Sequence, residues 1–205
     1  MINQATKKPI ILISQRVERH EQRNETRDSL DQALSRWVVA SEAIPINLPN
    51  TLLPEMLKEL LVQLMPTGII LSGGNNVGEF CERDKTETVL LDWAKLQNVP
   101  VLGICRGMQF IGIWSGTTLE RAKGHVAENH EICGDLNSIV NSYHDYSLKS
   151  VPKGFRPLAY AQDGHLEAIT SETDWPCEGW MWHPERDTPF DLTWLTRFRL
   201  LMRLD

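Results

Sequence analysis

Two short segments of this chain carry residue types that could perform nucleophilic catalysis. In the run VLGICRGMQ, residues 101–109, Cys105 follows an apolar stretch. In the run WHPE, His183 is followed two residues later by Glu185. A thiolate nucleophile, an imidazole that moves protons and a carboxylate that orients the imidazole together form the machinery of a cysteine hydrolase. The sequence therefore predicts an enzyme that forms a covalent thioester with its substrate.

The residues around Cys105 predict a sharp turn from a buried strand into a helix. A thiol reacts as the thiolate, which is favoured when the side chain is exposed at the N-terminus of a helix. Gly103 and Gly107 flank the cysteine, because strand and helix approach closely in such a strained turn. The backbone N–H of Arg106 is then placed to donate to an oxyanion. The alternative is a buried cysteine that only packs at the end of a core strand.

The WHPE run supplies the predicted base. In an extended segment, the side chains of His183 and Glu185 would point the same way, and Pro184 would stiffen the link between them. The carboxylate would orient the imidazole while the imidazole takes the thiol proton. An isolated His-x-Glu is usually a surface pair, so the assignment depends on its combination with Cys105.

A third segment, TGIILSGGNN at residues 67–76, predicts a buried strand that runs into a glycine loop. If the loop lies at the same edge of the sheet as Cys105, it could offer a second N–H group to an oxyanion. The same Gly-Gly-Asn residues also suit an ordinary turn.

Composition narrows the class of protein. The chain has 205 residues, which suits a single domain over 1–205, and its net charge is −6. Residues 16–36 are rich in arginine, but acidic residues balance them, which predicts a solvated helix face and excludes a nucleic-acid patch. The four cysteines form no C-x-x-C motif, and no long apolar run or signal peptide is evident. We therefore expect a cytoplasmic protein without membrane attachment.

The elements that must position these motifs follow from apolar patterning. Apolar runs predict strands at 9–14, 44–48, around 69 and into 105, and helical periodicity predicts helices at 27–40, 53–64 and 84–97. This alternation indicates a parallel, doubly wound sheet. After Gly116, short strands are expected at 138–143, 155–161, 165–169 and 179–182, with a hairpin turn at Asp163-Gly164 and a C-terminal helix through 194–202.

With these residues in place, GICRGMQ followed by WHPE resembles the class I glutamine amidotransferase-type proteins, in their branch of stand-alone γ-glutamyl hydrolases. Nearly the whole chain fits that pattern. The resemblance implies an α/β, flavodoxin-like fold, in which helices flank a central, mostly parallel sheet with a small antiparallel extension. It also implies a thioester mechanism with Cys105 as nucleophile, His183 as base and acid, and Glu185 as its orienting partner. Gly74 and Arg106 would supply the oxyanion N–H groups.

The same resemblance implies a set of substrate-binding residues. The run Val140–His144 matches the family segment that helps to hold the γ-glutamyl moiety, although a strand end with a solvated histidine is the alternative. Phosphates on a leaving group would need cationic partners, for which Arg16, Lys85 and Arg186 are candidates. The predicted substrate contacts are Gly73, Asn75, Gln109, Asn141, Ser142, Tyr143, His144, Arg16 and Arg186.

A narrower resemblance points to the γ-glutamyl-CDP-amidate hydrolases of capsular phosphoramidate synthesis. It rests on ISQR at 13–16, RDSL at 27–30, SGGN at 72–75, NSYHD at 141–145 and ERD at 185–187. It implies a nucleotide-linked γ-glutamyl substrate that is split into glutamate and cytidine diphosphoramidate. The longer insertion of γ-glutamyl-γ-aminobutyrate hydrolases after the glycine loop is missing.

Several alternatives stay open. The chain could be a γ-glutamyl-γ-aminobutyrate-type hydrolase, a glutaminase subunit that delivers ammonia to a synthase partner, or a degenerate domain retained for binding. Metal binding through His125, His130 and Cys133 fits no common zinc spacing, so no metal and no cofactor are expected; these histidines are expected to flank a turn before a strand. The expected partner is a small-molecule γ-glutamyl substrate, with no nucleic acid and no membrane, and a homodimer is one oligomeric option.

Overall fold

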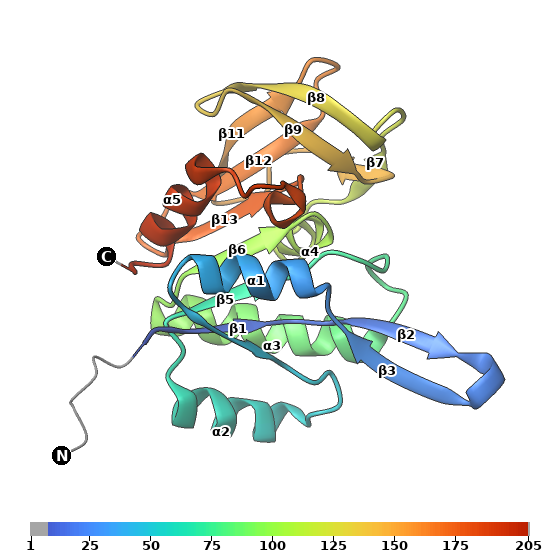
Figure 1. Ribbon diagram of the computed structural model, residues 1–205, viewed down its shortest axis with the longest axis vertical. Coiled ribbons are helices and arrows are strands. Elements are labelled where there is room, and N and C mark those ends of the chain that lie inside the picture. Colours follow the sequence, from blue (N-terminus) through green and yellow to red (C-terminus); the bar gives the residue numbers. More distant parts are fainter. Residues whose placement is uncertain (1–7, 205) are drawn as a thin grey trace.

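The computed structural model describes residues 8–204, which are organised around a nine-stranded sheet (Figure 1). Its strand order is β4-β1-β5-β6-β13-β12-β11-β8-β9. The first five strands in this order pair in parallel: β4 (Ile44–Asn47), β1 (Ile10–Ile13), β5 (Gly68–Leu71), β6 (Val101–Ile104) and β13 (Cys177–Trp180). The last four pair antiparallel: β12 (Leu166–Ser171), β11 (Phe155–Ala161), β8 (Val126–Gly134) and β9 (Ser138–Tyr143). The predicted parallel sheet with an antiparallel extension is confirmed.

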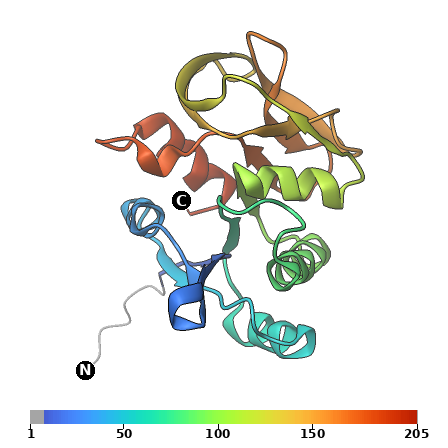
Figure 2. The same ribbon diagram turned by 90° about the vertical axis from the view of Figure 1, so that its right-hand side faces the viewer.

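Helices cover both faces of the parallel strands (Figures 1 and 2). The helices are α1 (Gln32–Ala40), α2 (Pro54–Leu64), α3 (Cys81–Gln97), α4 (Arg106–Trp114) and α5 (Leu192–Leu201). Apolar residues of α1 and α5 share one buried cluster, and those of α2, α3 and α4 share another. Strand side chains alternate between the two clusters, since Ile11 and Ile13 belong to the first and Leu12 to the second. Burial on both faces explains why these strands appear in the sequence as unbroken apolar runs.

Four of the seven tryptophans gather in the cluster under α1 and α5. The rings of Trp180 and Trp182 stack with centroids 5.5 Å apart, and Trp194 packs against both. Trp37 meets the edge of Trp180 from the side of α1. These large side chains join β13 and the two helices, so the end of β13 is firmly packed.

Residues 16–29 form a β-hairpin and not the start of a helix, so the predicted boundary of Arg27 is wrong. Strands β2 (Arg16–His20) and β3 (Glu25–Ser29) pair antiparallel and project from the end of β1 (Figure 1). A short 3₁₀ turn, η1 (Glu21–Arg23), ends at Asn24 in the left-handed conformation and closes the hairpin. The helix begins only after Asp31, whose side chain accepts a hydrogen bond from the N–H of Ala33.

The second half of the chain holds more strands than its pattern indicates. β7 (Leu119–Arg121) and β10 (Tyr146–Leu148) pair in a separate two-stranded sheet, and β8 was not expected at all. His130 therefore lies inside β8, and only His125 precedes that strand, which corrects the turn predicted between them. The hairpin at Asp163-Gly164 is confirmed, with Gly164 at φ +88° between β11 and β12.

Candidate active site

Cys105 occupies a strained turn between β6 and α4. Its φ of 51° and ψ of −106° place it outside the regions that non-glycine residues usually adopt. A Cβ atom on Gly103 would lie 2.6 Å from the backbone carbon of Gly107, and one on Gly107 would lie 2.1 Å from the carbonyl oxygen of Leu71. Both glycines are therefore required by close packing of strand against helix, as the sequence predicts. Cys105 is the residue that caps the N-terminus of α4.

The predicted base follows the neighbouring strand. β13 pairs in parallel with β6, and the N–H of Cys105 donates to the carbonyl oxygen of Trp180 over 2.7 Å. His183 therefore begins the loop beside the cysteine. Gly73 lies against it, because a Cβ atom there would be 2.7 Å from Cε1 of His183 and 3.7 Å from Cβ of Cys105. The three predicted segments thus meet at one sheet edge.

His183 and Glu185 are in contact, although the local backbone differs from the extended segment predicted. Pro184–Arg186 form a single 3₁₀ turn, η2, and Nδ1 of His183 lies 2.7 Å from Oε1 of Glu185. The turn curls the chain so that residues two apart approach each other. Burial alone would lower the pKa of His183, but the neighbouring Cys105 and Glu185 outweigh burial and raise this pKa to about 9.

Asn141 holds the backbone of His183 in place. Its side-chain amide donates to the carbonyl oxygen of His183 over 2.8 Å and accepts from the N–H of His183 over 3.0 Å. The same amide donates to Asp187 over 3.2 Å. Because both polar atoms of the amide are occupied, the structure places Asn141 as a positioning residue and not in contact with a substrate. Burial raises the pKa of Asp187.

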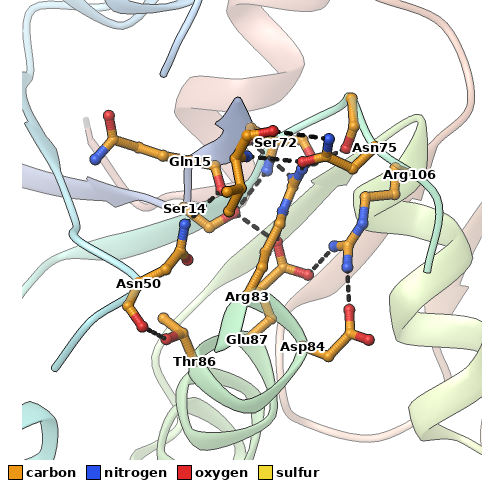
Figure 3. A network of polar contacts seen from close by, with 12 residues as sticks. Ser14, Gln15, Asn50, Ser72, Asn75, Arg83, Asp84, Thr86, Glu87 and Arg106 are labelled. Carbon is orange, nitrogen blue, oxygen red and sulfur yellow. Dashed lines mark hydrogen bonds and ion pairs between the residues drawn. The ribbon is translucent and has the colours of Figure 1, made fainter. Parts of the chain in front are cut away.

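A buried arginine organises the glycine loop (Figure 3). The guanidinium of Arg83 donates to the carbonyl oxygens of Ser72, Gly73 and Gly74. Within residues 8–204 the N–H groups of Gly73 and Gly74 donate no hydrogen bond. With the loop carbonyls held on one side, these amides remain available to an oxyanion.

Two further charges complete this buried polar network. Glu87 accepts hydrogen bonds from the side chains of Arg83, Arg106 and Ser14. The Arg106 guanidinium also pairs with Asp84 (Figure 3). Burial would raise the pKa of Glu87, but the two guanidinium groups outweigh burial and lower it. The side chain of Arg106 is therefore internal, and only its backbone N–H belongs to the candidate oxyanion site.

Two hollows meet at Cys105, and Gly74 and Tyr143 line both of them. The first also contains the predicted base, and the second contains Gln109, whose amide donates to the carbonyl oxygen of Tyr146 over 2.8 Å. Further lining residues of the first hollow are Arg16, Ser29, Asp31, Gly73, Glu185 and Arg186. A substrate with a γ-glutamyl part and a leaving group needs two such spaces on opposite sides of the nucleophile.

The other predicted substrate contacts are distributed unevenly. The side chain of Asn75 lines the second hollow but is bonded to the backbone of Val17, which ties β2 to the loop. Ser142 is fully buried and donates to the carbonyl oxygen of His125. His144 is buried, so the strand-end histidine is not solvated. Lys85 lies away from Cys105 in a separate hollow beside α2, which removes it from the predicted phosphate contacts.

The sequence reading did not identify the roles of Arg83, Glu87 and Asp187. One signal was present for the first two, since an Arg and a Glu at i and i+4 in an otherwise predicted helix form a natural pair. Nothing in the sequence distinguishes this pair from a solvated one, because its burial depends on α3 packing below the glycine loop. Asp187 gives no local signal.

Comparisons with known proteins agree with this geometry. A family model described as "Glutamine amidotransferase class-I" matches residues 25–201. The γ-glutamyl-CDP-amidate hydrolase of Campylobacter jejuni is 27% identical over 125 residues, which cover 58% of this chain and 62% of that protein. The γ-glutamyl-γ-aminobutyrate hydrolase of Escherichia coli O157:H7 is 26% identical over 201 residues, which cover 77% of this chain and 78% of that protein. The match thus spans about three-fifths of the Campylobacter protein.

A solved structure shows the same fold over nearly the whole chain. A Thermoplasma acidophilum protein described as one of the GMP synthase subunits superposes with a TM-score of 0.72 and 18% identity, covering 96% of this chain and 94% of its own. At that identity the likeness concerns the fold alone. Within residues 8–204, no helix has the length and apolar character needed to span a bilayer.

Proposed function

Because this chain belongs to the class I glutamine amidotransferase family, we propose that it hydrolyses a γ-glutamyl amide bond through a γ-glutamyl thioester on Cys105. One observation carries the proposal. Cys105, in its strained turn, lines the same hollow as His183, and the imidazole of His183 is bonded to Glu185. A nucleophile, a proton carrier and an orienting carboxylate are the minimum set for this chemistry.

In the first half-reaction, the Cys105 thiolate attacks the γ-carbonyl carbon of the substrate. The carbonyl oxygen becomes an oxyanion, and the backbone N–H groups of Gly74 and Arg106 stabilise it. The C–N bond then breaks, and the imidazolium of His183 gives its proton to the leaving nitrogen. The raised pKa of His183, about 9, keeps the imidazole protonated at neutral pH for this step.

In the second half-reaction, the now neutral His183 removes a proton from a water molecule. The water oxygen attacks the thioester carbon, the C–S bond breaks, and glutamate leaves with Cys105 again a thiolate. Glu185 stabilises the imidazolium that forms each time His183 gains a proton. Asn141 keeps the ring in position by holding both backbone polar groups of His183.

We further propose that the leaving group is cytidine diphosphoramidate, so that the substrate is γ-glutamyl-CDP-amidate. Two arginines, Arg16 and Arg186, line the hollow that contains Cys105. A guanidinium group binds phosphate oxygens through two parallel hydrogen bonds, so these side chains suit a diphosphate. The guanidinium of Arg186 lies 4.3 Å from the ring centroid of Tyr143, which holds it at the rim. The similarity to the Campylobacter protein supports the same substrate.

The test is glutamate release from three compounds in parallel: γ-glutamyl-CDP-amidate, γ-glutamyl-γ-aminobutyrate and free glutamine. We expect fast release from the first, and loss of all release when Cys105 is replaced by alanine in a variant whose circular dichroism matches the wild type. Preference for the second compound would overturn the leaving group and leave the thioester chemistry standing. Release that persists in Cys105→Ala would overturn both.

A glutaminase that serves a synthase is the second candidate. The fold likeness to the Thermoplasma GMP synthase protein keeps this function in view. Such a glutaminase would release little glutamate from any of the three compounds until a synthase partner binds. Mass spectrometry after a thiol-reactive glutamine analogue would then show modified Cys105 without turnover, which separates this case from a degenerate binding domain.

A further inference from the structure

Three histidines converge on one buried glutamate in the antiparallel half of the sheet, far along the chain from Cys105. We call His125, His130, His144 and Glu167 the histidine cluster. Nδ1 of His125 lies 3.5 Å and Nε2 of His144 lies 3.3 Å from Oε1 of Glu167, and Nε2 of His130 lies 3.4 Å from Oε2. Glu167 is fully buried, and His125 and His144 are 2% and 3% exposed. The proposed hydrolysis uses none of these side chains.

The atoms that face each other in the histidine cluster lack hydrogen-bond partners. Within residues 8–204, all three of these ring nitrogens and both carboxylate oxygens are buried without one. Buried polar groups are nearly always paired, so five such atoms at one point require an explanation. A carboxylate in this position can accept only from a proton or coordinate a cation.

The opposite ring nitrogens fix the tautomers. Nε2 of His125 lies 2.9 Å from Oδ2 of Asp163, and Nδ1 of His144 lies 3.1 Å from the carbonyl oxygen of Tyr146. Both oxygens are acceptors, so these nitrogens must carry the hydrogen. In the neutral rings, the other nitrogens then present lone pairs to the carboxylate of Glu167. Lone pairs facing a carboxylate repel each other unless a cation lies between them.

The spacing matches a metal ion better than a set of shared protons. Charge-assisted hydrogen bonds between nitrogen and oxygen measure about 2.7–2.9 Å, shorter than the three contacts here. A tetrahedral site with metal–ligand distances of about 2.0–2.1 Å has edges of about 3.3–3.4 Å. The ligand atoms of His125, His130 and Glu167 all lie within 4.8 Å of one another. We propose that the histidine cluster binds a divalent transition-metal ion of the zinc class, with His144 as the fourth ligand.

The surroundings suit such an ion. Asp163 holds the far nitrogen of His125, which is the common arrangement of a carboxylate behind a metal-binding histidine. Three imidazoles and one carboxylate favour Zn²⁺ and its neighbours over Mg²⁺ or Ca²⁺. Cys133, which the sequence alternative placed in the set, is exposed and stands an odd number of residues from His130 along β8, on the other face. Glu167 takes its place.

The ion would lock together segments that reach the candidate active site. His130 comes from β8, Glu167 from β12, and His144 from the turn that follows Tyr143. The carbonyl oxygen of Tyr146 accepts from both His144 and Gln109, and Gln109 lines the hollow beside Cys105. The site is thus structural, and it fixes the strand that carries Asn141 and Tyr143.

The test measures zinc directly on tag-free, chelator-treated protein. After dialysis against micromolar Zn²⁺ and desalting, we expect about one zinc per chain by mass spectrometry, in the wild type and equally in Cys105→Ala. At a hundredfold excess over the dissociation constant, zinc should raise the unfolding midpoint by about 5–10 °C. Glu167→Gln and His130→Gln should bind at least about 10-fold more weakly. His20→Asn, in the exposed hairpin, is the matched control and should bind as the wild type does.

Cobalt distinguishes this site from a cysteine site. Protein loaded with Co²⁺ should show the visible absorption of a tetrahedral ion without the intense near-ultraviolet band of a thiolate ligand. This measurement needs only wild-type protein, so it decides the matter if the variants fail to fold. Zinc below a tenth of an equivalent, a thiolate band, or unchanged affinity in folded Glu167→Gln and His130→Gln would overturn the proposal.

Discussion

The proposed role of His183 depends on the carboxylate beside it, and the dependence is visible in pH. The pKa of His183 is raised to about 9 despite burial, which lowers it, because Cys105 and Glu185 favour the charged ring. The protonated form needed to release the leaving group is present below this pKa and lost above it. We expect the rate of thioester formation to fall as pH rises through about 9.

Replacing Glu185 with glutamine removes the neighbouring charge and lowers the pKa of His183. The alkaline fall in rate should then begin at a lower pH than in the wild type, and the rate at neutral pH should drop. Single-turnover glutamate release between pH 6 and 10 measures both effects, with Glu178→Gln as control because Glu178 pairs with Arg197. An alkaline limb that stays where it was would contradict the assignment of Glu185.

Asn141 gives a second prediction of the same kind. Asn141→Ala removes both hydrogen bonds to the His183 backbone, so the imidazole loses its fixed position. We expect kcat to fall about 10- to 100-fold with KM little changed, since a positioning residue acts through the base. Asn137→Ala, in the turn before β9 where Asn137 bonds only to Gly134, should leave both constants as they are. A change in KM alone would instead indicate that Asn141 contacts the substrate.

Individual residues were the most predictable level, because chemistry restricts residue type more than structure does. Cys105, His183 and Glu185 were identified from their types and order, and the structure brings them together. Asn141 was predicted to touch the substrate, yet it holds the backbone. An amide has the same donors and acceptors in either task, so only its neighbours in space reveal which one it performs.

At the scale of elements, the buried network between α3 and the glycine loop should matter more than its surface counterparts. Arg83→Met removes the donor to three loop carbonyls and leaves Glu87 with one fewer cation. We expect a loss of about 3–5 kcal/mol in the free energy of unfolding, because one partner of a buried pair is removed. Urea denaturation measures it. Arg27→Met, in an exposed pair with Glu25, should cost less than about 1 kcal/mol.

Element prediction failed where strands are exposed on both faces. The β2–β3 hairpin and most of β8 expose the majority of their side chains, so no alternation of apolar and polar residues marks them. The buried strands β1, β5 and β6 were found because their apolar runs are continuous. Charged residues at 16–29 suit a solvated helix equally well, and it is pairing across the hairpin that decides the conformation.

At the scale of the whole molecule, the hairpin brings Arg16 to the hollow that the parallel sheet edge provides. Arg16→Ala should raise KM for γ-glutamyl-CDP-amidate about 10-fold, the cost of losing one charge-assisted contact to phosphate. KM for γ-glutamyl-γ-aminobutyrate, which has no phosphate, should not change. Arg23→Ala, in the exposed hairpin turn, is the matched control. Equal losses with both substrates would show that Arg16 supports the fold of the loop and does not select the leaving group.

The overall arrangement was predictable in its parallel part and less so beyond it. Alternating strands and helices have few ways to pack, whereas the antiparallel strands 126–171 pair across turns of varied length. The order β13-β12-β11-β8-β9 therefore could not be read from the chain. The histidine cluster depends on that order, because its members come from strands that only this pairing brings side by side.

The tryptophan cluster has a practical consequence for kinetics. Trp182 directly precedes His183, and its ring stacks on Trp180 at an interplanar angle of 6°. Indole emission responds to nearby charge and solvent, and the ring nitrogen of Trp182 is buried without a hydrogen-bond partner within the described residues. Formation and breakdown of an acyl-enzyme beside this ring should therefore register as a change in intrinsic fluorescence. The protein carries its own optical probe, and stopped-flow traces could time each half of the cycle without a label.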